Sequence, residues 1–176
     1  MKRFLVCAIV AVLAPLAASA QSSNPVSDTV KKVVAQRTKI IVAAAEAMPA
    51  EKYSFRPTPE QMTFGHLIMH LAQSNNFLCS AIAGTKPAEQ AKLSDTDPKD
   101  TLVTALKSSF EYCNGVLDKM DDSKLAEMVP MFRAPAPRAA VMITLTDDLY
   151  DHYSQAAIYL RLNGILPPTA QRRPMK

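Results

Sequence analysis

Apolar residues recur three and four positions apart in four long segments of the chain, and polar residues occupy many of the positions between them. This pattern predicts helices over residues 26–48, 64–83, 98–120 and 139–163. No segment shows the strict alternation of apolar and polar residues that a half-buried strand has. Because four amphipathic helices bury their apolar stripes best against one another, the predicted fold class is all-α, a four-helix bundle.

The residues between these segments are types that begin and end helices. Asn24, Thr63 and Asp97 are predicted N-caps, because their side-chain oxygens can accept from the first free backbone N–H groups. Gly84 and Gly164 are predicted C-terminal stops. A short helical turn is predicted after Met120. Prolines concentrate in two connections, which are therefore predicted loops: residues 50–62 and 129–138.

The first twenty residues differ in composition from the rest. Lys2 and Arg3 precede an apolar run over residues 4–16, and a small-residue site follows at Ala18-Ser19-Ala20. These features predict a cleaved signal peptide over residues 1–20 and a single mature domain over residues 21–176, exported to a bacterial periplasm. The apolar run is shorter than a membrane-spanning helix, and no later stretch is apolar enough, so no stable membrane insertion is expected.

Charge gives little indication of a polyanionic partner. The formal net charge is +4, and the loss of Lys2 and Arg3 with the signal peptide would leave about +2. No basic stripe with interleaved aromatic residues is present, so nucleic acid is not a predicted partner.

Cysteine usage agrees with export. Cys7 lies within the predicted signal peptide, which leaves Cys79 and Cys113 in the mature chain. An even number of cysteines in an oxidising compartment favours a disulfide over two free buried thiols. Because the two residues fall in different predicted helices, the bond would join those helices.

The candidate chemistry lies in histidines and a carboxylate at helical spacing. The chain has three histidines, and His66 and His70 are four positions apart, as are Asp148 and His152. Residues four apart share a helix face, and imidazole and carboxylate groups are common metal ligands. Two interpretations remain open: a metal site between two facing helices, or a solvated acidic face around residues 147–151.

Three stretches carry a family resemblance. Residues 62–72 read MTFGHLIMHLA, residues 109–113 read SFEYC, and residues 151–168 read DHYSQAAIYLRLNGILPP. With these motifs the mature chain resembles the DinB-like (DinB/YfiT) family of four-helix-bundle proteins, which are regarded as metalloenzymes. The last stretch is the most specific of the three. The resemblance implies a four-helix bundle of the DinB/YfiT-like type.

The resemblance also implies a ligand set. The family typically binds a divalent metal with one histidine on the second helix and a His-x3-His pair on the last. These positions correspond here to His70, Asp148 and His152, with Asp148 in place of a histidine. A site of two histidines and one carboxylate, for zinc, nickel, manganese or iron, is therefore expected. His66 is an alternative ligand, one turn from His70.

The resemblance implies a divalent-metal-dependent enzyme that acts on an unidentified small molecule by hydrolysis or thiol transfer. Because the chain is expected to be exported and the thiol cofactors of some relatives are cytoplasmic, hydrolysis is ranked above thiol transfer. An alternative stays open, namely a non-catalytic exported bundle that binds a small ligand or partner and whose metal site is degraded at Asp148. Whether the protein is an enzyme is thus left open. A homodimer through an exposed apolar helix face is a further expectation.

Overall fold

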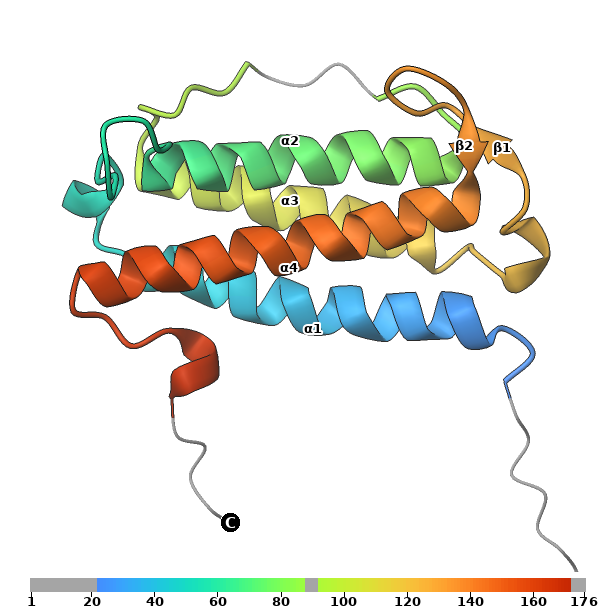
Figure 1. The fold of residues 1–176 in the computed structure, drawn as a ribbon, viewed down its shortest axis with the longest axis horizontal. Coiled ribbons are helices and arrows are strands. Elements are labelled where there is room, and N and C mark those ends of the chain that lie inside the picture. The colour runs from blue at the N-terminus through green and yellow to red at the C-terminus, as the bar shows by residue number, and fades with distance from the viewer. Residues whose placement is uncertain (1–21, 88–91, 172–176) are drawn as a thin grey trace, which may run out of the picture.

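A computed structural model describes residues 22–87 and 92–171. Its four long helices pack as a bundle (Figure 1), which confirms the predicted all-α fold class. The predicted signal peptide and Cys7 lie outside the described residues. Within the described ranges, no helix is both long and apolar enough to cross a membrane. The helices are α1 (Pro25–Ala47), α2 (Phe64–Ala83), α3 (Lys99–Leu117) and α4 (Arg138–Leu162).

The helices form a closed ring in the order α1, α4, α2, α3, so that α4 packs between α1 and α2. Helices α3 and α4 follow one another in sequence but sit on opposite corners of the ring, and their connection crosses one end of the bundle (Figure 1). The apolar stripe that the sequence predicts on each helix faces the centre of the bundle. The largest fully buried side chains include Ile41 of α1, Phe64, Leu67 and Leu71 of α2, and Leu102, Leu106, Phe110 and Leu117 of α3. Helix α4 adds the buried residues Val141, Leu145, Leu149 and Leu160.

Three of the predicted helix ends follow local sequence rules. The Thr63 hydroxyl accepts from the backbone N–H of His66 at 3.0 Å, as an N-cap does. Gly84 adopts φ 72°, the left-handed conformation that closes α2. Gly164 follows α4 with φ 73°. These ends were predicted correctly because each depends only on residues within one turn.

Asn24 occupies the predicted N-cap position of α1, although its side chain does not cap the helix, whereas the predicted cap at Asp97 is wrong because Pro98 holds the N-cap position of α3. The first N–H groups of α1, on Val26 and Ser27, donate instead to the Asp122 carboxylate at 3.0 and 2.8 Å. The Asn24 side chain accepts from the backbone N–H of Asp122. The Asp97 carboxylate accepts from the backbone N–H of Ser94, in the loop before α3. A carboxylate from the α3–α4 connection thus caps α1, which no local rule could predict.

The α3–α4 connection contains more structure than the predicted loop. The predicted helical turn is present as a 3₁₀ turn, η2 (Asp122–Lys124). Two short antiparallel strands follow, β1 (Met128–Val129) and β2 (Ala136–Pro137). Each has only two residues, which is too short to show a strand period in the sequence.

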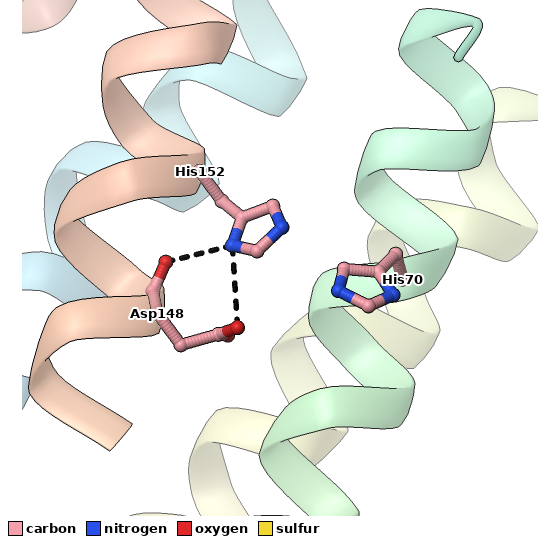
Figure 2. A group of neighbouring side chains, drawn as sticks. All are labelled: His70, Asp148 and His152. Atoms are coloured by element: carbon pink, nitrogen blue, oxygen red, sulfur yellow. Dashed lines mark hydrogen bonds and ion pairs between the residues drawn. The ribbon is translucent and has the colours of Figure 1, made fainter. Parts of the chain in front are cut away.

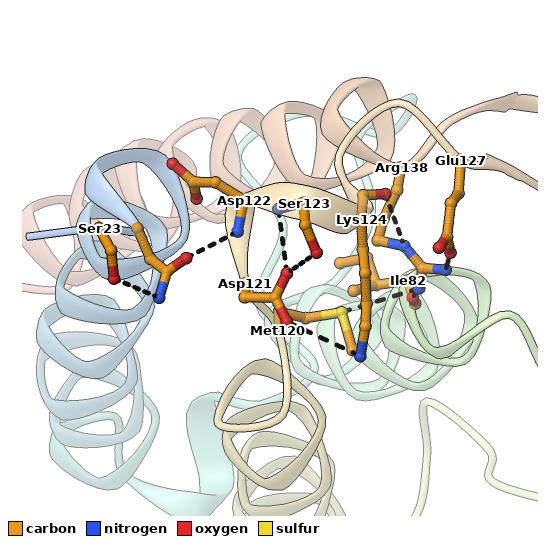
Figure 3. Close-up of polar contacts among 10 residues, drawn as sticks. Ser23, Ile82, Met120, Asp121, Asp122, Ser123, Lys124, Glu127 and Arg138 are labelled. Carbon is orange, nitrogen blue, oxygen red and sulfur yellow. Dashed lines mark hydrogen bonds and ion pairs between the residues drawn. The ribbon is translucent and has the colours of Figure 1, made fainter.

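Arg138, the first residue of α4, fastens this connection to α2 (Figure 3). Its guanidinium is buried and donates to the backbone carbonyls of Ile82 and Lys124 and to the Glu127 carboxylate. The carbonyl of Ile82 lies in the last turn of α2, where helix carbonyls lack partners. The first residue of α4 therefore satisfies a backbone carbonyl at the end of α2.

A disulfide joins Cys79 of α2 to Cys113 of α3, with a Cα–Cα distance of 5.3 Å. Both residues are fully buried. One turn earlier on each helix, the Asn75 amide donates to the Ser109 hydroxyl at 3.0 Å, so that a covalent and a polar contact lie side by side in the same interface. The disulfide favoured by the sequence is thus present.

Candidate metal centre

Three side chains converge where α2 and α4 pack together. His70 projects from α2, while Asp148 and His152 project from successive turns of α4 (Figure 2). One donor atom from each residue lies within 4.8 Å of the others. The two imidazole rings have centroids 4.7 Å apart. The structure therefore brings together the three residues predicted as ligands.

His152 has a defined orientation. Its Nδ1 lies 2.7 Å from the backbone carbonyl oxygen of Asp148, one turn earlier on α4. The carbonyl can only accept, so this contact requires the proton on Nδ1 and leaves the lone pair on Nε2. Metal-binding histidines commonly donate their second N–H to a carbonyl in this manner. His152 is thus held in a tautomer and orientation suited to coordination through Nε2.

Asp148 has a buried oxygen without a partner. Its Oδ1 lies 3.4 Å from Nδ1 of His152, whereas Oδ2 is buried and has no hydrogen-bond partner among the described residues. A buried acceptor left unsatisfied costs about 1–3 kcal/mol, and more when it is charged. A cation between this carboxylate and the two imidazoles would remove that cost. The residues present therefore fit a divalent ion.

The acidic run on α4 divides between two environments. Asp147 and Asp151 are exposed, and Asp151 accepts from the Gln155 amide at 2.9 Å. Asp148 instead is half-buried against α2. The solvated-face interpretation therefore applies to the two flanking residues, while Asp148 belongs to the cluster.

His66, the alternative ligand, lies outside the cluster. Its Nδ1 is 3.6 Å from the Asp95 carboxylate in the α2–α3 connection, and both side chains are well exposed. Asp95 gives no signal of this pairing in the sequence, because it lies in a polar loop far from His66 along the chain. The sequence analysis also did not predict that the Asp148 backbone carbonyl orients His152, because sequence patterns indicate side chains and not backbone contacts.

The electrostatics of the cluster favour neutral imidazole at His70. Burial lowers the pKa of His70 below its ordinary value, and His152 and His66 lower it further, while Asp148 acts in the opposite direction. A histidine must be neutral to bind a metal ion. His70 is therefore ready to act as a ligand at neutral pH.

In the metal-free protein, NMR titration should show His70 with a pKa below that of a free imidazole. The Asp148→Asn variant should lower the pKa of His70 further, because it removes the one neighbour that favours the protonated ring. A His70 pKa that rises in this variant would contradict the electrostatic description of the cluster.

The comparisons with known proteins identify the family. The family model described as the DinB superfamily matches residues 34–156, which include all three residues of the cluster. The chain belongs to the DinB superfamily. This confirms the resemblance inferred from the motifs on the second and last helices. A comparison of the sequence with curated proteins finds no match.

Solved structures share the DinB fold. A DinB-like protein from Bacillus cereus has 16% identity and a TM-score of 0.67, covering 80% of this chain and 95% of its own. A second DinB-like protein, from Bacillus subtilis, has 18% identity and a TM-score of 0.67, covering 82% and 99%. A variant of a mycothiol-dependent maleylpyruvate isomerase has 13% identity and a TM-score of 0.60, covering 74% and 59%. At these identities the likeness shows the fold alone.

Proposed function

We propose that this DinB-superfamily protein is an exported, divalent-metal-dependent enzyme of the hydrolase type, with the ion held by His70, Asp148 and His152. The proposal rests on one observation above all: the buried Oδ2 of Asp148 has no partner and belongs to a cluster with two imidazoles. Such an arrangement is costly without a cation and favourable with one.

Each residue of the cluster has a distinct role in this proposal. His70 and His152 supply neutral nitrogen donors from two different helices, and Asp148 supplies the only negative charge of the set. The Asp148 carbonyl keeps the His152 ring in place. Two histidines and one carboxylate leave coordination positions open for substrate. A divalent ion held there supplies Lewis-acid chemistry, which activates water near neutral pH.

The choice of hydrolysis over thiol transfer rests on the expected compartment. The composition of residues 1–20 is that of a signal peptide, and the buried Cys79–Cys113 disulfide is typical of exported proteins. One protein of similar fold is described as mycothiol-dependent. An oxidising compartment disfavours chemistry that consumes a free thiol, so water is the better-supported nucleophile here.

A second candidate is a non-catalytic exported bundle that binds a small ligand or partner. It is favoured by Asp148 itself, which stands where the family resemblance implies a histidine. A shorter, anionic ligand changes both the reach and the charge of the site, and a site that has lost its ion would retain the fold.

Metal analysis separates the two candidates. The protein purified without chelator should contain a divalent ion, and the stripped protein should take up zinc, nickel, manganese or iron. The loaded protein should then hydrolyse model ester or amide substrates faster than the stripped protein. Failure to bind any of these ions would exclude the enzyme, whereas binding without hydrolysis would favour the second candidate.

A further inference from the structure

A small apolar cavity lies at the end of the bundle that carries β1 and β2. Its volume is about 180 Å³, and it opens between the last two turns of α2 and the loop that joins the two strands (Figure 1). Phe77 and Ala81 of α2 form one wall, and Pro130, Met131 and Phe132 of the β1–β2 loop form the other. A concave site lined in this way can take up a small apolar group.

Phe132 gives the cavity an exposed aromatic wall. Its side chain is 74% exposed, the highest value among the large apolar residues of the described ranges. The ring stacks on that of Phe77, with centroids 4.6 Å apart and an angle of 25° between the planes. The stack covers one face of the Phe132 ring and holds the ring in a fixed orientation. The uncovered surface of that ring is therefore available to pack against a further ring.

Both walls are held in place by contacts within the chain. Arg138, which follows β2, donates to the Ile82 carbonyl of α2 and to the carboxylate of Glu127, which precedes β1. These contacts tie both ends of the strand pair to the end of α2. The residues after α2 are fixed by the backbone N–H of Thr85, which donates to the Ser80 carbonyl at 2.9 Å. A preformed cavity of this kind loses little conformational entropy when it binds a ligand.

The charge at the cavity is positive. Among the described residues, Lys86 is the only charged residue that lines the cavity, and it forms no ion pair with any of them. A carboxylate on a bound ligand would gain a charge-assisted contact with this ammonium group. A cationic ligand would be repelled by it. The cavity therefore favours a ligand with an apolar body and one negative group.

The volume limits the size of that apolar body. A cavity of about 150 Å³ lined by apolar side chains takes up benzene. The 180 Å³ available here thus admits one six-membered ring with a short substituent. A small aromatic carboxylate matches the volume, the exposed ring of Phe132 and the charge of Lys86 together.

We propose that the cavity between the end of α2 and the β1–β2 loop binds a small aromatic carboxylate, with its ring against Phe132 and its carboxylate at Lys86. The site is separate from the metal cluster. Phe77 lies seven residues beyond His70 on α2, which places it about 10 Å further along the helix axis. Binding at this cavity therefore does not require the ion.

An NMR titration with benzoate tests the site. The backbone amide signals of Ala81, Thr85 and Phe132 should shift saturably, with a dissociation constant of about 0.1–5 mM, as expected for a ligand of this size. The constant should be the same for the protein as purified and after removal of metal. Acetate, which lacks the ring, should bind at least about tenfold more weakly. Absence of saturable shifts at these residues, or equal binding of acetate, would overturn the proposal.

Two variants test the walls of the cavity. Phe132→Ser should raise the benzoate dissociation constant at least about tenfold, because it removes the stacking surface. This side chain is mostly exposed, so the variant should fold as wild type does. Ala81→Leu should abolish binding, because the larger side chain fills the cavity from α2. Thermal melts check that both variants are folded. Wild-type affinity in the folded Phe132→Ser protein would show that the ligand binds elsewhere.

The charge of the site is tested by comparing two ligands. Lys86→Gln should weaken benzoate binding about threefold, the size of effect expected for one exposed charge pair. It should leave the binding of benzyl alcohol, which has the ring without the charge, unchanged. Lys32→Gln, which removes an exposed lysine from α1, is the matched control and should bind both ligands as wild type does. Equal effects of the two lysine variants on benzoate would refute the role of Lys86.

Discussion

Replacing His152 by alanine is expected to weaken zinc binding about a hundredfold or more. The change removes one of two nitrogen donors together with its oriented lone pair, and loss of an outer partner alone typically costs 10- to 100-fold. Competition with a chromophoric chelator measures the affinity directly. His70→Ala should have a similar effect. Because His70 is less buried than His152, the His70→Ala variant also distinguishes the loss of a metal ligand from damage to the core.

His66→Ala is the matched control for these variants. It removes a histidine one turn from His70, but its ring is directed at Asp95 rather than at the cluster. Zinc affinity should stay within about threefold of wild type, the change expected when no ligand is lost. Asp148→Asn should weaken binding strongly, because it keeps the shape of the side chain and removes its charge. If instead His66→Ala abolished binding and Asp148→Asn did not weaken it, the assigned ligand set would be wrong.

Loss of the Cys79–Cys113 disulfide is expected to lower the free energy of unfolding by about 3–4 kcal/mol, the chain-entropy value for a loop of this size. The two cysteines are 34 positions apart, so the bond constrains much of the unfolded α2–α3 segment. Urea unfolding of oxidised and reduced wild-type protein isolates the cross-link, because both forms retain the sulfur atoms that pack in the core.

The Cys79→Ala, Cys113→Ala double variant completes that experiment. It should resemble the reduced protein, with a further loss from the small cavities that the missing sulfur atoms leave. Adding reductant should not change its midpoint. If oxidised and reduced wild type had the same unfolding midpoint, the disulfide would not be a stabilising element of the bundle.

The fold was predictable from the sequence because its determinants are mostly local. The apolar period of each helix spans several turns, and Thr63 and Gly84 act on neighbours within one turn. The determinants that were missed act over long distances. Asp122 caps α1 from the α3–α4 connection, and Arg138 reaches the end of α2. Arg138 follows a proline-rich stretch, so the sequence alone places it in a loop, and only the fold shows which groups surround its side chain.

The candidate site was predictable only in part. The spacing of Asp148 and His152 shows that they share a face, but it does not show that this face meets His70, because no single-chain pattern reports which helices are neighbours. The family resemblance supplied that pairing. The flanking residues Asp147 and Asp151 made the acidic run ambiguous, and only the packing of α4 against α2 distinguishes the half-buried carboxylate from the exposed ones.

The separation of the cluster along the chain has a thermodynamic consequence. His70 and Asp148 are 78 positions apart, so their donor atoms meet only after α2 and α4 have docked. An ion bound there would interact with the folded state and hardly at all with the unfolded chain. By mass action, free ion at a hundred times its dissociation constant would add about 2.7 kcal/mol to the free energy of unfolding. The supply of that ion would then set how often the chain opens to proteases, and so how long it persists.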